Sequence, residues 1–360
     1  MTAVDQARRA DLRYVHRGSF SGIAGYLRTA LEPRASLFTY DLLPLARRPA
    51  LLPQRLRAMV EARREGRGIP WTKTAAWSAA VQRRASADGA LAGGPVLFVQ
   101  TWPAFVTDGG LRYSIYTDRV ARDGAAGAQA HASRFTPQWS ERETRFVRGA
   151  ERVYLMGPHC REVLERYYGV APERIAVLGG GPNMALGPPV ASERCRRLLF
   201  VGVDWHRKGG PELLDAFARV RVDFPDLELT LVGSGPDHPV PAGVRALGRV
   251  PHAGMDAVYS EADLFVLPTH HEAFGVVLIE AITKALPCVH TTVGSQRWIV
   301  GDAGEAVEPG DVDSLAAAIR AVVADYPSYK RRADRRAEEA RQSLRWEAVA
   351  DVIVRDMVPA

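Results

Sequence analysis

Two glutamates frame the stretch of this sequence that is best suited to chemistry, HEAFGVVLIEA at residues 271–281. Glu272 is expected in a loop at the carboxyl end of an apolar strand, and Glu280 about one turn into the helix that follows. The free backbone N–H groups and the dipole at the start of such a helix favour a diphosphate. A carboxylate accepts paired hydrogen bonds from hydroxyl groups. The pattern therefore predicts that the two glutamates hold hydroxyl groups at both ends of a nucleotide sugar.

Two cations follow another predicted strand, in the segment RRLLFVGVDWHRKGG at residues 196–210. The strand breaks into a glycine-containing loop that carries Arg207 and Lys208 before the next helix. In an open α/β sheet, ligands bind beyond the carboxyl ends of the strands. Cations placed there neutralise phosphates and stabilise a departing diphosphate. The alternatives are that Lys208 only caps a surface loop, and that Glu272 and Glu280 are an ordinary loop carboxylate and an exposed helix residue.

Strands and helices alternate around these residues, which is typical of a parallel sheet. In the second half each strand and helix unit takes about 30 residues, as in a nucleotide-binding doubly wound sheet. In the first half, an apolar strand at 12–15 leads into a glycine-bearing loop and an amphipathic helix. Further strands are predicted at 95–101, 113–119 and 152–158, and an exposed helix at 141–149.

The length of 360 residues and a stretch rich in glycine and proline at 175–192 predict two domains. We place the first domain at 1–185 and the second at 186–345. The last segment, 346–360, is predicted to be a helix that crosses back to the first domain. The charged stretch at 330–345 is interpreted as a solvated helix face.

Composition and charge narrow the class of protein. A hydrophobic content of 47% with 24% charged residues is typical of a globular protein. The net charge of +6 favours anionic partners, which include nucleotide phosphates, nucleic acid and anionic membrane surfaces. Three widely spaced cysteines without C-x-x-C pairing indicate a reducing cytoplasm. The charged start of the chain and the lack of a long apolar stretch make secretion and membrane spanning unexpected.

The motifs together resemble the retaining glycosyltransferases of family 4, also called glycosyl transferases group 1. The E-x7-E pattern of that family matches Glu272 to Glu280, and its G-x5-K-G loop runs from Gly202 through Lys208. The LVGSGP turn at 231–236 and the sequence YSEADLFVLPT ahead of the EAFG loop match as well. The resemblance covers the second half and is weaker in the first. It implies the α/β GT-B fold, with two Rossmann-like, doubly wound parallel-sheet domains that face a central cleft.

The resemblance also implies roles for individual residues. Glu272 would bind hydroxyls of the donor sugar and Glu280 would bind the ribose, while Lys208, together with Arg207, would hold the diphosphate. The other implied contacts are Phe274, Gly275 and Val276 to sugar and phosphate, Arg249 and Val250 to the base, and Gly18 and Gly22 to the phosphates from the first domain.

Two positions depart from the family pattern. The arginine that usually follows the first glycine of the G-x5-K-G loop is Val203 here. The first-domain histidine found in many members near the transferred sugar is replaced by a stretch that reads YTDRVARDG. Asp118 in that stretch is then the candidate catalytic residue on the acceptor side, and His131 is the nearest histidine downstream.

The resemblance implies a metal-independent enzyme that moves a hexose-type sugar from a nucleotide-diphosphate sugar, with UDP- or GDP-sugars expected, to an acceptor hydroxyl. No cofactor is expected, and the anomeric configuration is kept. The acceptor stays open among a glycan, a lipid and a secondary metabolite, and the oligomeric state is not predicted. Two alternatives to this function are a nucleotide-sugar-binding protein without transferase activity and a GT-B nucleotide-sugar epimerase.

Other signals have simpler explanations. The D-x-D sequence at 311–313 precedes a predicted helix, so we interpret it as a helix cap in place of a metal site. Arginines are interleaved with acids along the helices, which argues against nucleic-acid binding. The segment 43–68 joins basic and apolar residues, so peripheral contact with the inner face of a membrane is one interpretation. An ordinary helix that covers the first domain is favoured, in a cytoplasmic bacterial protein.

Overall fold

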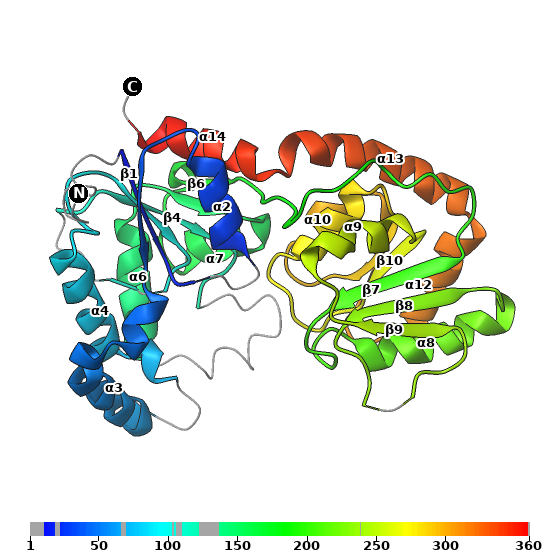
Figure 1. The fold of residues 1–360 in the computed structure, drawn as a ribbon, viewed down its shortest axis with the longest axis horizontal. Helices are drawn as coiled ribbons and strands as arrows, with labels where there is room; N and C mark the ends of the chain where they lie inside the picture. The colour runs from blue at the N-terminus through cyan, green and yellow to red at the C-terminus, as the bar shows by residue number, and fades with distance from the viewer. Residues whose placement is uncertain are drawn as a thin grey trace. The chain divides into compact units, whose positions relative to one another are not determined.

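The structure is a computed structural model that divides the chain into two compact units (Figure 1). The first unit comprises residues 1–179 together with 346–360, and the second comprises 180–345. The chain thus leaves the first unit earlier than the boundary that we placed after residue 185. The residues whose structure is described are 11–18, 22–65, 70–102, 104–105, 110–121, 137–237 and 239–358.

The first unit is built on a parallel sheet of six strands in the order β2-β1-β3-β4-β5-β6. Its strands are β1 (Leu12–His16), β2 (Leu37–Asp41), β3 (Val96–Val99), β4 (Tyr113–Thr117), β5 (Val153–Leu155) and β6 (Ile175–Val177). Its helices are α2 (Ile23–Leu31), α3 (Leu52–Glu65), α4 (Ala75–Ala87), α6 (Pro137–Gly149), α7 (Arg161–Arg166) and α14 (Trp346–Met357). The central strands β3 and β4 are buried throughout, as expected for a parallel sheet that is covered on both faces.

The second unit has a parallel sheet of the same size in the order β12-β11-β10-β7-β8-β9. Its strands are β7 (Arg197–Gly202), β8 (Glu228–Gly233), β9 (Val244–Gly248), β10 (Leu264–Leu267), β11 (Cys288–Thr291) and β12 (Gly304–Val307). Its helices are α8 (Gly210–Asp223), α9 (His252–Ser260), α10 (Val276–Thr283), α11 (Gln296–Val300), α12 (Val312–Ala324) and α13 (Tyr326–Ser343). Phe200, Leu229 and Phe265 are buried in its core.

The predicted fold class is confirmed, because each unit is an α/β layer structure with a doubly wound parallel sheet. The predicted helix cap is also confirmed, since the Asp311 carboxylate accepts a hydrogen bond of 2.9 Å from the backbone N–H of Ser314 at the start of α12. The strands β2 and β12 were not predicted. Both lie at sheet edges and are only partly buried, so their apolar patterns are short.

The expectation of an exposed helix at 141–149 is wrong. The helix α6 does expose Glu141, but Glu143, Phe146 and Val147 on its other side are buried. The charged stretch in α13 likewise has a buried side, formed in part by Lys330, which is only 8% exposed. In both helices the buried positions recur at helical spacing, and the arginines are exposed or half-buried.

Candidate active site

The strand order of the second sheet defines where a ligand can bind. The chain order runs outward from β7 to β8 and β9 on one side, and from β10 to β11 and β12 on the other. The strands β7 and β10 are parallel neighbours, so the loops at their carboxyl ends diverge at the point where the order reverses. Open α/β sheets bind ligands at such a point. The loop after β7 carries Lys208 and the loop after β10 carries Glu272.

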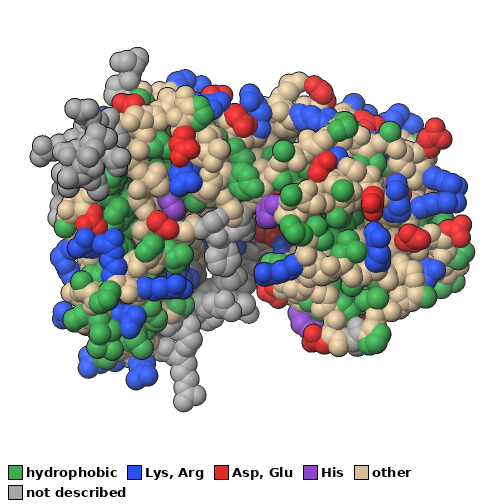
Figure 2. Space-filling view, viewed as in Figure 1, with side chains coloured by type: hydrophobic (Ala, Val, Ile, Leu, Met, Phe, Trp, Pro, Cys, Tyr) green, Lys and Arg blue, Asp and Glu red, His purple; other side chains and the backbone are tan. Residues whose placement is uncertain are grey.

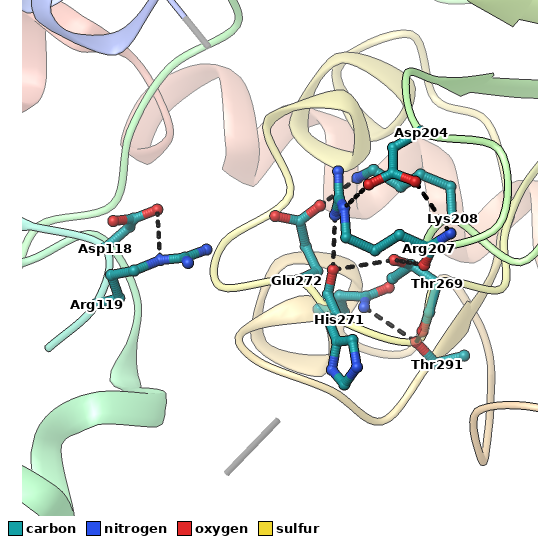
Figure 3. A network of polar contacts seen from close by, with 10 residues as sticks. Asp118, Arg119, Asp204, Arg207, Lys208, Thr269, His271, Glu272 and Thr291 are labelled. Atoms are coloured by element: carbon teal, nitrogen blue, oxygen red, sulfur yellow. Dashed lines mark hydrogen bonds and ion pairs between the residues drawn. The ribbon is translucent and has the colours of Figure 1, made fainter. Parts of the chain in front are cut away.

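Lys208 and Glu272 form an ion pair between Nζ and Oε2 (Figure 3). The Lys208 side chain is 9% exposed and the Glu272 side chain 17% exposed. Both charges are therefore largely removed from water, where each acts on the other and on a bound anion with little solvent screening. The structure thus brings together the two residues that the sequence placed on separate motifs, and the idea that Lys208 only caps a surface loop is wrong.

Arg207 ties the same two loops together from the other side. Its Nη1 donates a hydrogen bond of 2.8 Å to the carbonyl oxygen of His271, and its Nε donates to Asp204 at 2.9 Å (Figure 3). The carbonyl oxygen of Arg207 in turn accepts a hydrogen bond of 2.9 Å from the backbone N–H of His270. The Arg207 guanidinium has donors left for a phosphate, but part of it serves to hold the loop that carries Glu272.

A buried threonine network supports the loop after β10. The hydroxyl of Thr291 donates to the carbonyl oxygen of Thr269 at 2.8 Å, and the amide of Gln296 donates to the Thr291 hydroxyl at 3.1 Å. All three side chains are fully buried. These residues could not be predicted from the sequence, because threonine and glutamine in isolation carry no signal of such a role.

Two glycines allow the loops to come this close. Gly209 has a φ of +75°, and a Cβ at this position would lie 2.0 Å from the carbonyl oxygen of Pro268. Gly294 has a φ of +61°, and a Cβ there would lie 2.1 Å from the carbonyl oxygen of Glu272. Any side chain at Gly294 would therefore displace the backbone of Glu272, so this glycine is a part of the site that the motif search missed.

Glu280 lies in the fifth position of α10 and is only 3% exposed, so the alternative of an exposed helix residue is wrong. Its Oε1 accepts a hydrogen bond of 3.1 Å from the backbone N–H of Asn183, and its Oε2 accepts one of 2.8 Å from the Tyr259 hydroxyl. Burial raises the pKa of the Glu280 carboxyl. Each oxygen keeps a lone pair for a ligand hydroxyl, so binding of a ribose by Glu280 stays a prediction.

The start of α10 lies directly after Glu272. Gly275 caps the helix with a φ of +95°, Val276 is its first residue, and Phe274 is buried against the partly exposed ring of Trp298. The first N–H groups of this helix have no partner within it. Arg249 and Val250 lie between β9 and α9, and Arg249 is exposed. Their predicted contact with a base is not tested by the structure.

The remaining predicted residues belong to the first unit. Gly18 and Gly22 both precede α2, with φ values of +56° and +76°. The Gly18 N–H donates a hydrogen bond of 2.9 Å to the Asp41 carboxylate. Asp118 follows β4 and pairs with Arg119 at 4.0 Å (Figure 3). His131 lies outside the described residues.

A buried glutamate supports the segment after Asp118. Glu143 accepts hydrogen bonds from the hydroxyls of Thr101 and Tyr168 and from the backbone N–H of Ala121. Burial raises the pKa of the Glu143 carboxyl, while these donors act in the opposite sense. The role of Glu143 was not predicted, because the charged residues around it in the sequence indicated a solvated helix.

Among the residues that the structure describes, no group of histidine, cysteine, aspartate and glutamate side chains could hold a metal ion. Within the same residues, no helix is both long and apolar enough to cross a membrane. Val203, at the position where the family has an arginine, is 53% exposed.

Known proteins resemble the chain in both sequence and structure. The family model described as Glycosyl transferases group 1 matches residues 195–325. Glycogen synthase of Mycobacterium tuberculosis is 29% identical over 243 residues, which are 63% of this chain and 56% of that protein. Phosphatidyl-myo-inositol mannosyltransferase of Mycobacterium leprae is 33% identical over 49% of each chain. The chain thus spans about half the length of the curated relatives it matches.

Two solved structures cover almost the whole chain. WaaG, a glycosyltransferase involved in lipopolysaccharide biosynthesis, has a TM-score of 0.61 at 17% identity, and the match covers 95% of this chain and 99% of WaaG. A glycosyltransferase from Rickettsia africae has a TM-score of 0.63 at 12% identity, over 96% of both chains. The fold is that of the GT-B glycosyltransferases. Within the second unit, residues 195–325 match the family described as Glycosyl transferases group 1.

A buried histidine beside the threonine network leads to a prediction about the effect of pH on stability. His290, next to Thr291, is 1% exposed, and burial lowers its pKa to about 4. Because this is below the usual value near 6.5, the folded protein binds fewer protons than the unfolded chain. Above the unfolded pKa, His290 is neutral in both states and favours neither of them. As the pH falls below that value, protonation stabilises the unfolded chain and the free energy of unfolding decreases. We expect the His290 contribution to the free energy of unfolding to drop by about 2 kcal/mol between pH 7 and pH 5.

Urea unfolding of the natural protein and of His290→Gln at both pH values tests this expectation. The variant is expected to lose less stability on acidification, whereas His206→Gln, which removes an exposed histidine, should behave as the natural protein does. An equal loss in the natural protein and in His290→Gln would contradict the prediction.

Proposed function

We propose that the chain is a retaining, metal-independent glycosyltransferase that moves a hexose-type sugar from a nucleotide-diphosphate sugar to an acceptor hydroxyl. The observation that carries the proposal is the buried Lys208–Glu272 ion pair at the switch point of the second sheet, beside the start of α10. The names of the relatives, a glycogen synthase and a mannosyltransferase, support a hexose. The acceptor stays open among a glycan, a lipid and a secondary metabolite.

In this proposal the second unit holds the donor. Lys208 and the N–H groups at the start of α10 bind the diphosphate, and Glu272 accepts hydrogen bonds from sugar hydroxyls. As the bond between the anomeric carbon and the β-phosphate oxygen breaks, negative charge grows on that phosphate. Lys208 lies in a water-poor site, so it stabilises this charge without reorganisation.

The acceptor oxygen then bonds to the anomeric carbon on the face from which the phosphate departs, so the configuration is kept. The acceptor proton passes to the departing phosphate oxygen, and no protein base is needed behind the sugar. Asp118 is the candidate residue for orienting the acceptor. The proposed donor is a UDP- or GDP-sugar.

A thermal-shift screen with EDTA present tests donor binding. We expect the melting temperature to rise with either UDP or GDP and its sugar conjugates, because a ligand that binds the folded state stabilises it by mass action. Uridine and guanosine serve as controls that lack the diphosphate, and they should cause little shift. No shift with any nucleotide diphosphate at millimolar concentration would contradict the donor site.

Transfer is tested separately from binding, by release of the nucleoside diphosphate and by the anomeric configuration of the product. One observation favours a second candidate, a nucleotide-sugar-binding protein without turnover: Val203 leaves the site without a cation that the family usually has. A melting shift without any release of the nucleotide would support this second candidate. Inversion at the anomeric carbon, or loss of activity in EDTA, would contradict the proposed mechanism.

A further inference from the structure

The helix α3 turns an apolar stripe toward solvent. Leu52, Leu56, Met59 and Val60 are 42%, 53%, 37% and 48% exposed. Their spacing of i, i+4, i+7 and i+8 puts them on one side of the helix, in the pattern by which most helices face a protein core. Here the side that faces the unit carries the small residue Ala58, which is fully buried, and α3 packs against α4. The favoured interpretation of an ordinary covering helix therefore leaves the larger apolar residues unexplained.

Arginines border this stripe. Arg57, Arg63 and Arg64 are exposed on α3, and Arg47 is exposed just before it. Figure 2 shows the hydrophobic and the basic side chains gathered together at the end of the first unit where α3 lies. None of these four arginines forms an ion pair with a residue that the structure describes. Among the described residues, no acid therefore offsets their charges.

The one acidic side chain of α3 that the structure describes points away from this face for a structural reason. Glu61 is the single acid between residues 42 and 64. Its two carboxylate oxygens accept hydrogen bonds of 2.9 and 3.0 Å from the backbone N–H groups of Ala75 and Ala76, at the start of α4. Glu61 therefore points toward the unit and binds α3 to α4, so it does not offset the arginines of the outer face.

We propose that the outer face of α3 docks on the surface of a membrane that contains anionic lipids. A helix with an apolar side bordered by cations lies in the plane of such a surface, with its leucines among the acyl chains and its arginines at the phosphates. A second copy of this chain fits less well, because two copies of this face would bring the arginines of both together. The proposal concerns the first unit alone and does not depend on sugar transfer.

Co-sedimentation with vesicles tests the proposal, in the absence of any nucleotide sugar. The full chain is mixed with vesicles of phosphatidylcholine alone or of an equal mixture of phosphatidylcholine and phosphatidylglycerol. We expect binding to the anionic vesicles to be at least about tenfold stronger than to the neutral ones, and to weaken as salt is raised. Equal binding to both kinds of vesicle, or no binding to either, would overturn the proposal.

Two double variants separate the apolar from the basic contribution. Leu56→Gln with Val60→Gln shortens the apolar stripe, and Arg63→Gln with Arg64→Gln removes two cations. Each is expected to weaken binding to the anionic vesicles by about tenfold. The altered side chains are exposed, so the melting temperature should stay close to that of the natural protein. The control is Val222→Gln on α8, which removes an 82% exposed valine from the second unit.

The control variant should bind vesicles as the natural protein does. If it lost as much binding as the α3 variants, or if the α3 variants bound normally, the outer face of α3 would not be the docking surface. Sedimentation velocity without lipid tests whether a second copy of the chain binds to the apolar stripe instead. A stable dimer that the Leu56→Gln, Val60→Gln variant abolishes would assign the stripe to a second copy of the chain.

Discussion

Replacing Glu272 with alanine is expected to lower kcat/KM for sugar transfer by about 10²- to 10³-fold. The Glu272 carboxylate is the acidic partner of Lys208 in a site where both side chains are largely buried. In the proposed mechanism, the substitution removes the hydrogen-bond acceptor for the donor-sugar hydroxyls, and Lys208 loses its ion pair. Transfer is measured over a range of donor concentrations, which gives both kcat/KM and kcat, and the melting temperature reports whether the fold survives.

Two further variants sharpen this test. Glu272→Gln keeps the shape and one acceptor oxygen, so a smaller loss than with alanine would separate hydrogen bonding from charge. Glu261→Gln is the matched control, because it removes an acid from an exposed pair with Arg245 in the same unit. Turnover of Glu272→Ala at the natural rate, with donor saturating, would show that this glutamate is not in the active site.

The substitution Lys208→Met is expected to weaken donor binding by about tenfold and to lower kcat by about a further 10²-fold. Methionine fills much of the same space, but it supplies no charge to the diphosphate or to the departing phosphate. Glu272 also loses its ion pair with Lys208 in a poorly solvated site, which is expected to destabilise the fold by about 1 to 3 kcal/mol. Isothermal titration with the nucleoside diphosphate, steady-state kinetics and urea unfolding measure the three effects.

The double variant Lys208→Met, Glu272→Gln serves as the control for stability. It removes both charges, so it is expected to regain part of the lost free energy of unfolding without regaining activity. Unchanged donor affinity and unchanged kcat in Lys208→Met would place the phosphate site elsewhere. Arg245→Gln, in the exposed pair with Glu261, controls for loss of a cation from this unit.

The site residues that could be predicted are those that lie in continuous sequence motifs. Lys208 and Glu272 each follow a strongly apolar strand and each precede a helix, so their place at the carboxyl end of a parallel sheet followed from local pattern. Their meeting depends on the adjacency of β7 and β10, which the strand order determines and the local pattern does not.

The partners of the buried acids could not be predicted, because they come from distant segments. Glu280 is held by the backbone of Asn183, 97 residues away in the sequence, and Glu143 by Thr101, 42 residues away. A glutamate among arginines on a helix has the same local pattern whether it faces water or a hydroxyl-lined interior. The edge strand β12 escaped prediction for a related reason, since one partner strand and partial burial leave a short apolar run.

The two passages of the chain between its units have a consequence for synthesis on the ribosome. The second unit is an insertion within the first, because residues 180–345 are made before α14. In the first unit α14 packs against α2, and Asp351 of α14 pairs with Arg34, just after α2, at 2.5 Å. At the usual speed of translation, about 5 to 20 residues per second, α2 is made roughly 15 to 65 s before α14. During that interval the nascent first unit exposes apolar surface to which a chaperone can bind. The second unit is continuous in sequence, so it can fold as it emerges.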